Sequence, residues 1–193
     1  MLFRSLIAAR DLTRAFNRQD TEYPLLGEIV ACLPPPAGII DAISQAISER
    51  GEILDQASDK LAVIRRDLKV AHERLYSRLE RMLNDRDTAS MLQESIITLR
   101  NDRYVIPLRA EFKGRIRGLV HDQSSSGATL FIEPLAVVEL NNQWHELQLA
   151  ERDEEQRILA DLSLHVGQNA EQLESILAAL GRFDLALMCA RYA

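Results

Sequence analysis

The sequence has few cysteines, aromatic residues and glycines, and this scarcity argues against several common protein classes. Its two cysteines, Cys32 and Cys189, lie far apart and lack metal-ligand spacing, so they predict buried thiols in a reducing compartment rather than disulfides. Aromatic residues make up 5% of the chain and glycines number 8, which is low for an all-β fold. No apolar run approaches the ~20 residues that cross a bilayer, and the apolar stretch at the N-terminus is too short for a signal peptide. We therefore expect a cytoplasmic protein.

An excess of positive charge is also missing. The net charge of −6 argues against a broadly basic nucleic-acid-binding domain, so any contact with phosphate must come from a local patch. The sequence has neither a Gly-x-x-x-x-Gly-Lys-Ser/Thr phosphate loop nor a dinucleotide fingerprint. We therefore expect no cofactor in this chain, and neither binding nor hydrolysis of ATP. With 193 residues, 47% of them hydrophobic and 27% charged, the chain can still bury a real core.

Apolar residues at intervals of three and four predict helices over most of the sequence. Short helices are expected over 2–16, 25–33 and 39–47, and the prolines at 34–36 must stop the second of these. Residues 49–57 are typical of a connector.

Two longer segments predict a pair of coiled-coil-like helices. Residues 58–84 carry an apolar stripe with charged residues on the other faces, and Ser58 is a plausible N-cap. A second segment runs from 135 to about 166, where the acidic stretch 151–155 interrupts the stripe and favours a solvated arm. A last apolar helix over 170–193 is expected to lie in the core.

Between the two long segments the apolar period changes from 3.6 to 2. Residues 103–112 alternate as a half-buried strand requires, and turns are expected at Lys113-Gly114 and at 123–127. This pattern predicts a small antiparallel meander of about three strands at about 103–133. The expected fold is thus mainly α, with a helical core, two long antiparallel coiled-coil-like helices and this β meander.

A possible catalytic group lies in the serine-rich turn. His121, Asp122 and one of the serines 124–126 are the residue types of nucleophilic catalysis. Adjacent residues on a strand point to opposite faces, so His121 and Asp122 cannot easily form the base and orienter pair, and no Gly-x-Ser-x-Gly elbow is present. We favour a polar hairpin turn in which Asp122 and the serines cap backbone amides. The four histidines show no metal-ligand spacing, so we predict no metal site.

The segment 100–121 contains a local basic patch. It has six basic and two acidic residues, a net charge of +4, which leaves −10 for the rest of the chain. Basic side chains on one extended face can follow a nucleic-acid backbone without reading its sequence. The alternative is an edge strand whose charges only prevent aggregation. The candidate phosphate contacts are Arg103, Arg109, Lys113, Arg115 and Arg117.

Five stretches of the chain carry a family likeness. They are LQE at 92–94, RYVIPLRAEFKG at 103–114, GLVHDQSSSGATLFIEP at 118–134, VVELNN at 137–142 and ARYA at 190–193. These stretches resemble the middle region of the bacterial MutS paralogues of type two. The likeness is specific over about 92–142 and weaker over the helical remainder.

The resemblance to this family implies a domain organisation and a function that the spacing of residues alone does not. Members of that family are cytoplasmic homodimers with a helical core, lever helices, an ABC-type ATPase domain and usually a C-terminal Smr nuclease domain. They are associated with suppression of homologous recombination on branched DNA, and some with the splitting of collided ribosomes. The resemblance therefore implies branched or duplex DNA as partner, with the ribosome or its RNA as the alternative, and no membrane.

The likeness stops before the ATPase domain would begin. The chain is accordingly expected to be a non-catalytic core and lever fragment, with ATP, Mg²⁺ and nuclease activity belonging to the full-length protein. The expected segments are a helical core part (1–57), a first lever helix with its connector (58–99), a basic clamp-like β tip (100–134), a second lever helix (135–168) and a return to the core (169–193).

Overall fold

The structure is a computed structural model that describes residues 2–16 and 23–192. The chain divides into two compact units, Met1–Ser58 with Gln156–Ala193, and Asp59–Glu155. The described residues are mainly helical and include a small antiparallel sheet, as the sequence predicts. The finer division into five segments stays a prediction.

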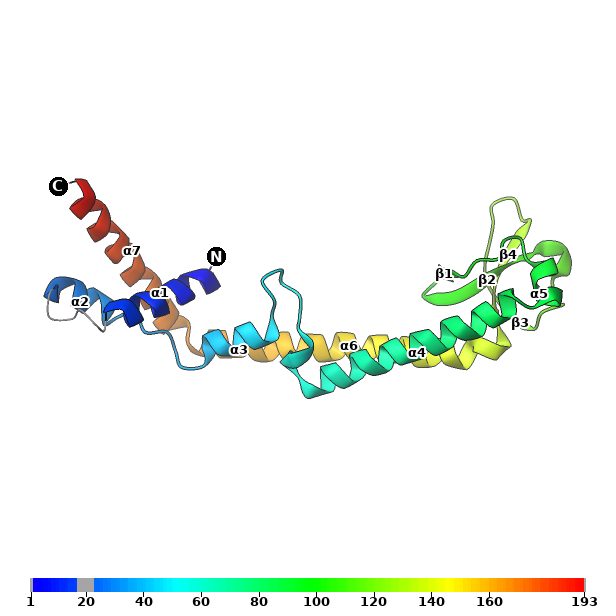
Figure 1. Cartoon of the computed structure of the whole chain (residues 1–193), viewed down its shortest axis with the longest axis horizontal. Helices are drawn as coiled ribbons and strands as arrows, with labels where there is room; N and C mark the ends of the chain where they lie inside the picture. The colour runs from blue at the N-terminus through cyan, green and yellow to red at the C-terminus, as the bar shows by residue number, and fades with distance from the viewer. Residues whose placement is uncertain (1, 17–22, 193) are drawn as a thin grey trace. The chain divides into compact units, whose positions relative to one another are not determined.

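The first unit is built from helices around one apolar core. They are α1 (Leu2–Phe16), α2 (Pro24–Val30), α3 (Ile39–Ala46), the short 3-10 helix η1 (Asp55–Ala57), the last part of α6 and α7 (Ala170–Tyr192) (Figure 1). Helix α2 begins at Pro24, because proline is tolerated in the first turn, and the prolines at 34–36 follow its end. The expected helices over 2–16, 25–33 and 39–47 are therefore confirmed to within a few residues.

The core of this unit joins side chains from α1, α3 and α7, among them Leu6, Ile39 and Ile176. Phe16 of α1 meets Phe183 of α7 edge-on, with ring centroids 5.8 Å apart. The apolar spacing of these helices thus buries one stripe of each against the others.

Helix α7 lies in the core, as its apolar composition suggested, but with one face only. It buries the stripe that carries Leu173, Ile176 and Phe183, whereas Leu185 and Met188 are exposed. The last residue of the predicted helix, at 193, lies outside the described residues.

The prediction of buried thiols is wrong for both cysteines. Cys32 and Cys189 are exposed free thiols. Cys32 lies in the turn that follows α2, and Cys189 lies on the exposed last turns of α7, so neither position faces the apolar core.

The second unit combines two long helices with the sheet. Its elements are α4 (Asp59–Leu83), α5 (Arg86–Met91), β1 (Thr98–Arg100), β2 (Arg103–Arg109), the short 3-10 helix η2 (Ala110–Phe112), β3 (Gly118–Gln123), β4 (Thr129–Pro134) and the first part of α6 (Leu135–Gln168). The sheet lies where α4 ends and α6 begins, so the two helices run antiparallel away from it (Figure 1). Leu79 of α4, Ile106 of β2 and Trp144 of α6 belong to one buried cluster.

The sheet has four antiparallel strands in the order β1-β2-β4-β3. Alternation did not reveal β1, a three-residue strand, and the strand expected over 103–112 ends at Arg109, where η2 begins. Asn101 and Asp102 both have positive φ, 50° and 58°, as a tight hairpin turn between β1 and β2 requires. Because β4 lies between β2 and β3, the strand order differs from that of a simple meander.

The acidic stretch 151–155 of α6 is solvated on one side only: Arg152 and Asp153 are exposed, as expected, whereas the other residues face α4. The side chain of Glu154 is fully buried, 3.0 Å from Lys60 Nζ of α4. Arg65 of α4 reaches Glu151 with Nε at 2.7 Å and Glu155 with Nη2 at 2.8 Å. Acidic residues replace apolar ones in this stretch because they form ion pairs with basic residues of α4.

Among the described residues, no helix combines the length and the apolarity that a membrane span requires.

Candidate nucleic-acid interface

Three of the predicted phosphate contacts lie in one short loop between η2 and β3. We call residues 113–117 the basic loop; it carries the exposed side chains of Lys113, Arg115 and Arg117. The loop is held by its backbone: Lys113 N–H donates to Ala110 O at 3.1 Å, and Arg115 N–H donates to Phe112 O at 3.0 Å. Gly114 has φ +85°, a conformation in which a side chain would be strained.

The cations of the basic loop form no ion pair within the part of the chain that the structure describes. Among the described residues, no carboxylate lies within ion-pair distance of Lys113, Arg115 or Arg117. Three like charges within five residues repel one another, and an anion placed between them would relieve that repulsion. The loop therefore presents unpaired positive charge in an otherwise acidic chain.

The guanidinium of Arg109, the fourth predicted phosphate contact, already has two partners within the protein. Its Nε donates to Leu92 O at 3.1 Å, and its Nη1 lies 3.9 Å from Glu111 Oε1. Its side chain is still 45% exposed, so part of the charge of Arg109 remains open to solvent.

Arg103, the fifth, belongs to a different network. Its Nη1 donates to Asn142 Oδ1 at 2.6 Å and lies 3.4 Å from Glu133 Oε1. The Glu133 side chain is only 1% exposed, and its other oxygen lies 2.6 Å from His121 Nε2. A buried carboxylate needs such partners, so Arg103 compensates Glu133 inside the protein.

The candidate catalytic group does not assemble. His121 pairs with Glu133, whereas Asp122 points to Arg100, with Arg100 Nε 3.3 Å from its Oδ2. Ser124 Oγ accepts from the N–H of Thr129 at 3.0 Å, and Ser126 Oγ accepts from the N–H of Ala128 at 3.4 Å. The interpretation as a hairpin turn with capping side chains is thus confirmed. Among the described residues, no group of three or more His, Cys, Asp or Glu side chains could hold a metal ion.

The β1–β2 turn fastens the strand that follows the basic loop. Asn101 Nδ2 donates to His121 O of β3 at 3.1 Å. Besides its pairing with Asp122, Arg100 places its guanidinium carbon 4.4 Å from the centre of the Phe131 ring. These contacts hold β3 on β4, at the point where the register shifts between Val120 and Asp122.

Asn141 and Tyr104, for which the sequence predicted no role of their own, attach the sheet to the helices. The side chain of buried Asn141 of α6 accepts from Tyr104 N–H at 3.0 Å and donates to Tyr104 O at 3.1 Å. The Tyr104 hydroxyl lies 2.9 Å from His72 Nε2 of α4. Burial, followed by the proximity of Tyr76, raises the pKa of Tyr104 above its ordinary value. A polar residue within the apolar stripe of 135–166 was the available signal for Asn141.

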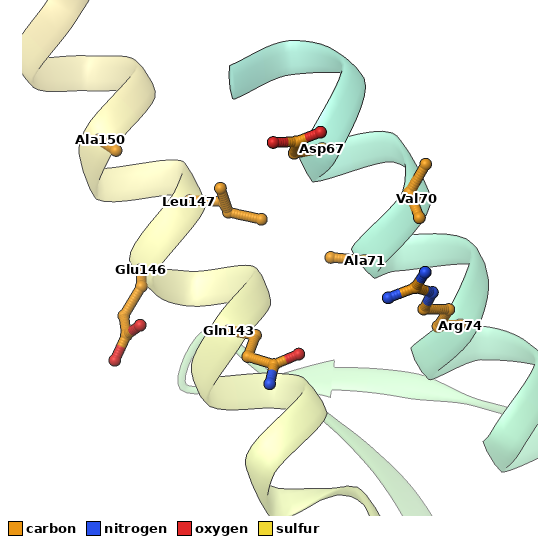
Figure 2. A pocket seen from close by; sticks show the side chains of 8 residues that line it. All are labelled: Asp67, Val70, Ala71, Arg74, Gln143, Glu146, Leu147 and Ala150. Atoms are coloured by element: carbon orange, nitrogen blue, oxygen red, sulfur yellow. The ribbon is translucent and has the colours of Figure 1, made fainter. Parts of the chain in front are cut away.

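A groove of about 530 Å³ runs between α4 and α6. Figure 2 shows its lining, in which Leu147 points across toward α4 while Glu146 points away from it. Asp67 and Arg74 contribute opposite charges on the α4 side. The mixed charge of this groove does not favour the binding of phosphate groups.

Comparison with known proteins identifies the chain's relatives. It is 45% identical over 192 residues, 98% of its length, to endonuclease MutS2 of Thermomicrobium roseum. It is 43% identical over 97% of its length to endonuclease MutS2 of Pelotomaculum thermopropionicum, and 45% identical over 89% to that of Listeria innocua. Over its own length, the chain belongs to the MutS2 family.

The chain covers only part of these MutS2 proteins. It spans 24% of the first two relatives and 22% of the third. No family model matches it. The name endonuclease belongs to those longer MutS2 proteins, whereas the basic loop and its supporting contacts are features of this chain.

Proposed function

We propose that this MutS2 segment binds nucleic acid through its basic loop, with branched DNA as the preferred partner. The observation that carries the proposal is the exposure of Lys113, Arg115 and Arg117 without an ion-pair partner among the described residues, in a chain of net charge −6. Phosphates would replace the missing counter-charges, and the released counterions would drive binding. Arg109 adds to this surface, and Arg103 supports it from inside.

The rigid backbone around the loop supports the same proposal. The N–H groups of Lys113 and Arg115 bond back to η2, and the N–H of Leu135, the first residue of α6, donates to Arg117 O at 3.0 Å. The three cations are therefore presented by a loop that is attached at both ends. A surface prepared in this way loses less conformational entropy when it binds a phosphate backbone.

The two long helices would serve as levers. In the full-length protein, α4 and α6 would transmit the nucleotide state of an ATPase domain, loaded with ATP and Mg²⁺, to the β tip. The ion pairs of Arg65 with Glu151 and Glu155 support this role, because they tie the two helices side by side in the second unit. Homodimerisation, nuclease activity and suppression of recombination belong to this proposal for the full-length protein, and this segment itself would be non-catalytic.

Charge reversal tests the proposal. The triple variant Lys113→Glu, Arg115→Glu, Arg117→Glu should weaken binding to a labelled four-way junction at least about tenfold at 50 mM salt, measured by fluorescence anisotropy. The matched control reverses three exposed cations of α4, Lys69, Arg74 and Arg78, and should retain most of the affinity. Equal losses in both triples, or none in either, would count against the basic loop as the binding surface.

A second candidate is a module that binds the ribosome or another protein. The exposed apolar side chains of α7, among them Leu185, Leu187 and Met188, favour it, because such side chains commonly lie in protein interfaces. On this alternative the basic loop would only protect a sheet edge. The loop reversals would then leave nucleic-acid binding unchanged, while replacement of the three α7 residues by polar ones would abolish recovery of the partner.

A further inference from the structure

An apolar hollow lies directly beside the basic loop. Its volume is about 410 Å³, within the ~300–1,000 Å³ of small-ligand pockets. Ile116, Val120, Leu130 and Leu135 supply apolar side chains, and Lys113 and Arg117 of the basic loop complete this part of the lining. Val120 is 49% exposed and Leu135 is 55% exposed, so apolar carbon is open to solvent next to unpaired positive charge.

The walls of the hollow are fixed by the fold. At Gly118, where β3 begins, an added Cβ would lie 2.5 Å from Glu133 O, so the strand can approach β4 this closely only with glycine. The N–H of Leu135 donates to Arg117 O at 3.0 Å, which joins the end of the basic loop to the start of α6. The hollow is therefore bounded by the sheet, the first residue of α6 and the basic loop, which is hydrogen-bonded to α6.

The combination of an apolar surface with adjacent cations selects a particular ligand chemistry. A nucleic-acid strand carries phosphates and, where its bases are unpaired, apolar base faces within one nucleotide of them. In a duplex those faces are stacked inside and cannot enter a surface hollow. The aliphatic side chains of the lining make no hydrogen bond to a base edge, so they would accept any base.

We propose that the hollow receives an unpaired base of a single-stranded segment whose phosphates lie on Lys113, Arg115 and Arg117. This inference rests on the proposed function and adds to it a preference for unpaired over paired nucleic acid. Junctions, gaps and strand ends would be bound better than continuous duplex, because they offer bases outside the stack.

The test compares strands that differ only in their bases. The 193-residue chain is titrated, with anisotropy as readout, against a labelled 15-nucleotide strand, the same strand with three central abasic sites, and the duplex. All bound phosphates are alike, so a difference between the two single strands reports base contact. We expect the abasic strand to bind about fivefold more weakly than the intact strand, the low end of what stacking on an aromatic side chain contributes, because the lining here is aliphatic.

A charge-neutral variant locates the effect. Val120→Thr with Leu135→Gln makes the hollow polar at two half-exposed positions and leaves the basic loop intact. It should reduce the ratio between intact and abasic strands to about one, with duplex affinity unchanged. The matched control, Val63→Thr with Leu149→Gln, alters two apolar side chains of α4 and α6 that are 44% and 46% exposed and should preserve the ratio.

The outcomes separate the two proposals. If intact and abasic strands bind equally while the loop charge reversals still abolish binding, the base site is overturned and the proposed function stands. If no nucleic acid binds in a salt-dependent way, both fail. If the hollow variant instead dissociates a dimer of the chain in sedimentation while the strands bind equally, the hollow is an interface between copies, and the base site is overturned.

Discussion

His121 Nε2 lies 2.6 Å from Glu133 Oε2, and the same carboxylate has its other oxygen 3.4 Å from Arg103 Nη1. The histidine and the arginine come from β3 and β2, on either side of β4. Glu133 thus joins three strands through one side chain that is 1% exposed. This network explains why two of the chain's most chemically suggestive residues, His121 and Arg103, have a structural role.

Removal of the carboxylate should be costly. Glu133→Ala leaves Arg103 and His121 without their buried partner, and we expect the free energy of unfolding to fall by about 2–4 kcal/mol. Urea denaturation followed by circular dichroism measures this change. Asp153→Ala, at an exposed acidic position of α6, is the control and should change it by less than about 0.5 kcal/mol. A loss at Glu133 no larger than that of the control would contradict the network.

Substitution of Arg103 should change the stability of the protein, whereas substitution of Arg115 should change its binding to phosphate. Arg115→Ala should reduce the slope of log affinity against log salt by about 1, because one phosphate contact is lost. Arg103→Ala should lower the unfolding midpoint in urea and leave that slope unchanged in the folded protein. A change of slope of about 1 for Arg103→Ala would show that this arginine does contact phosphate.

The sequence predicted the helices and strands that carry these residues, but not which of the cations are already paired. The apolar stripe of 58–84 and the alternation of 103–112 are local patterns, so they predicted α4 and β2 closely. The pairing of Arg103 with Glu133 joins residues 30 positions apart, and such contacts have no local signature. The charge count found the basic segment, and only the structure showed which cations in it already have partners.

The sequence predicted that the long helices pair, but the ion pairs between them had no local signature either. Taken alone, the acidic stretch 151–155 predicts solvent exposure, because buried carboxylates are rare. Its partners, Lys60 and Arg65, lie on α4, far earlier in the chain. Arg65 and Glu155, for example, are 90 positions apart. Charge complementarity between distant helices was the missing information.

Arg65 should contribute to the helix pair far more than its neighbour. Its side chain is 25% exposed and meets two carboxylates, so Arg65→Ala should lower the free energy of unfolding by about 1–2 kcal/mol. Arg66 is 70% exposed and lies 3.6 Å from adjacent Asp67, so Arg66→Ala should change it by less than about 0.5 kcal/mol. Urea titrations of both variants decide this, and equal effects would argue against the interhelical role of Arg65.

Tyr104 should make the protein sensitive to alkaline pH. Because burial raises its pKa in the folded state above the ~10 of an unfolded chain, the folded state holds the proton longer. The stabilisation is fully present below pH ~10 and is lost as pH rises from there through the folded pKa. The free energy of unfolding should therefore fall between pH 9 and pH 11. In Tyr104→Phe that fall should be smaller, and in Tyr192→Phe, at a position 86% exposed, it should match the wild type. An identical pH dependence in all three proteins would contradict this origin.

The basic loop is the centre of the functional account, and its salt dependence tests it most directly. The affinity for duplex DNA is measured from 50 to 300 mM salt for the wild type, for Lys113→Ala with Arg115→Ala and Arg117→Ala, and for Lys69→Ala with Arg74→Ala and Arg78→Ala. The account predicts that the loop variant loses about 2–3 from the slope of log affinity against log salt, while the helix variant keeps the wild-type slope. Equal slopes in the wild type and the loop variant would contradict it.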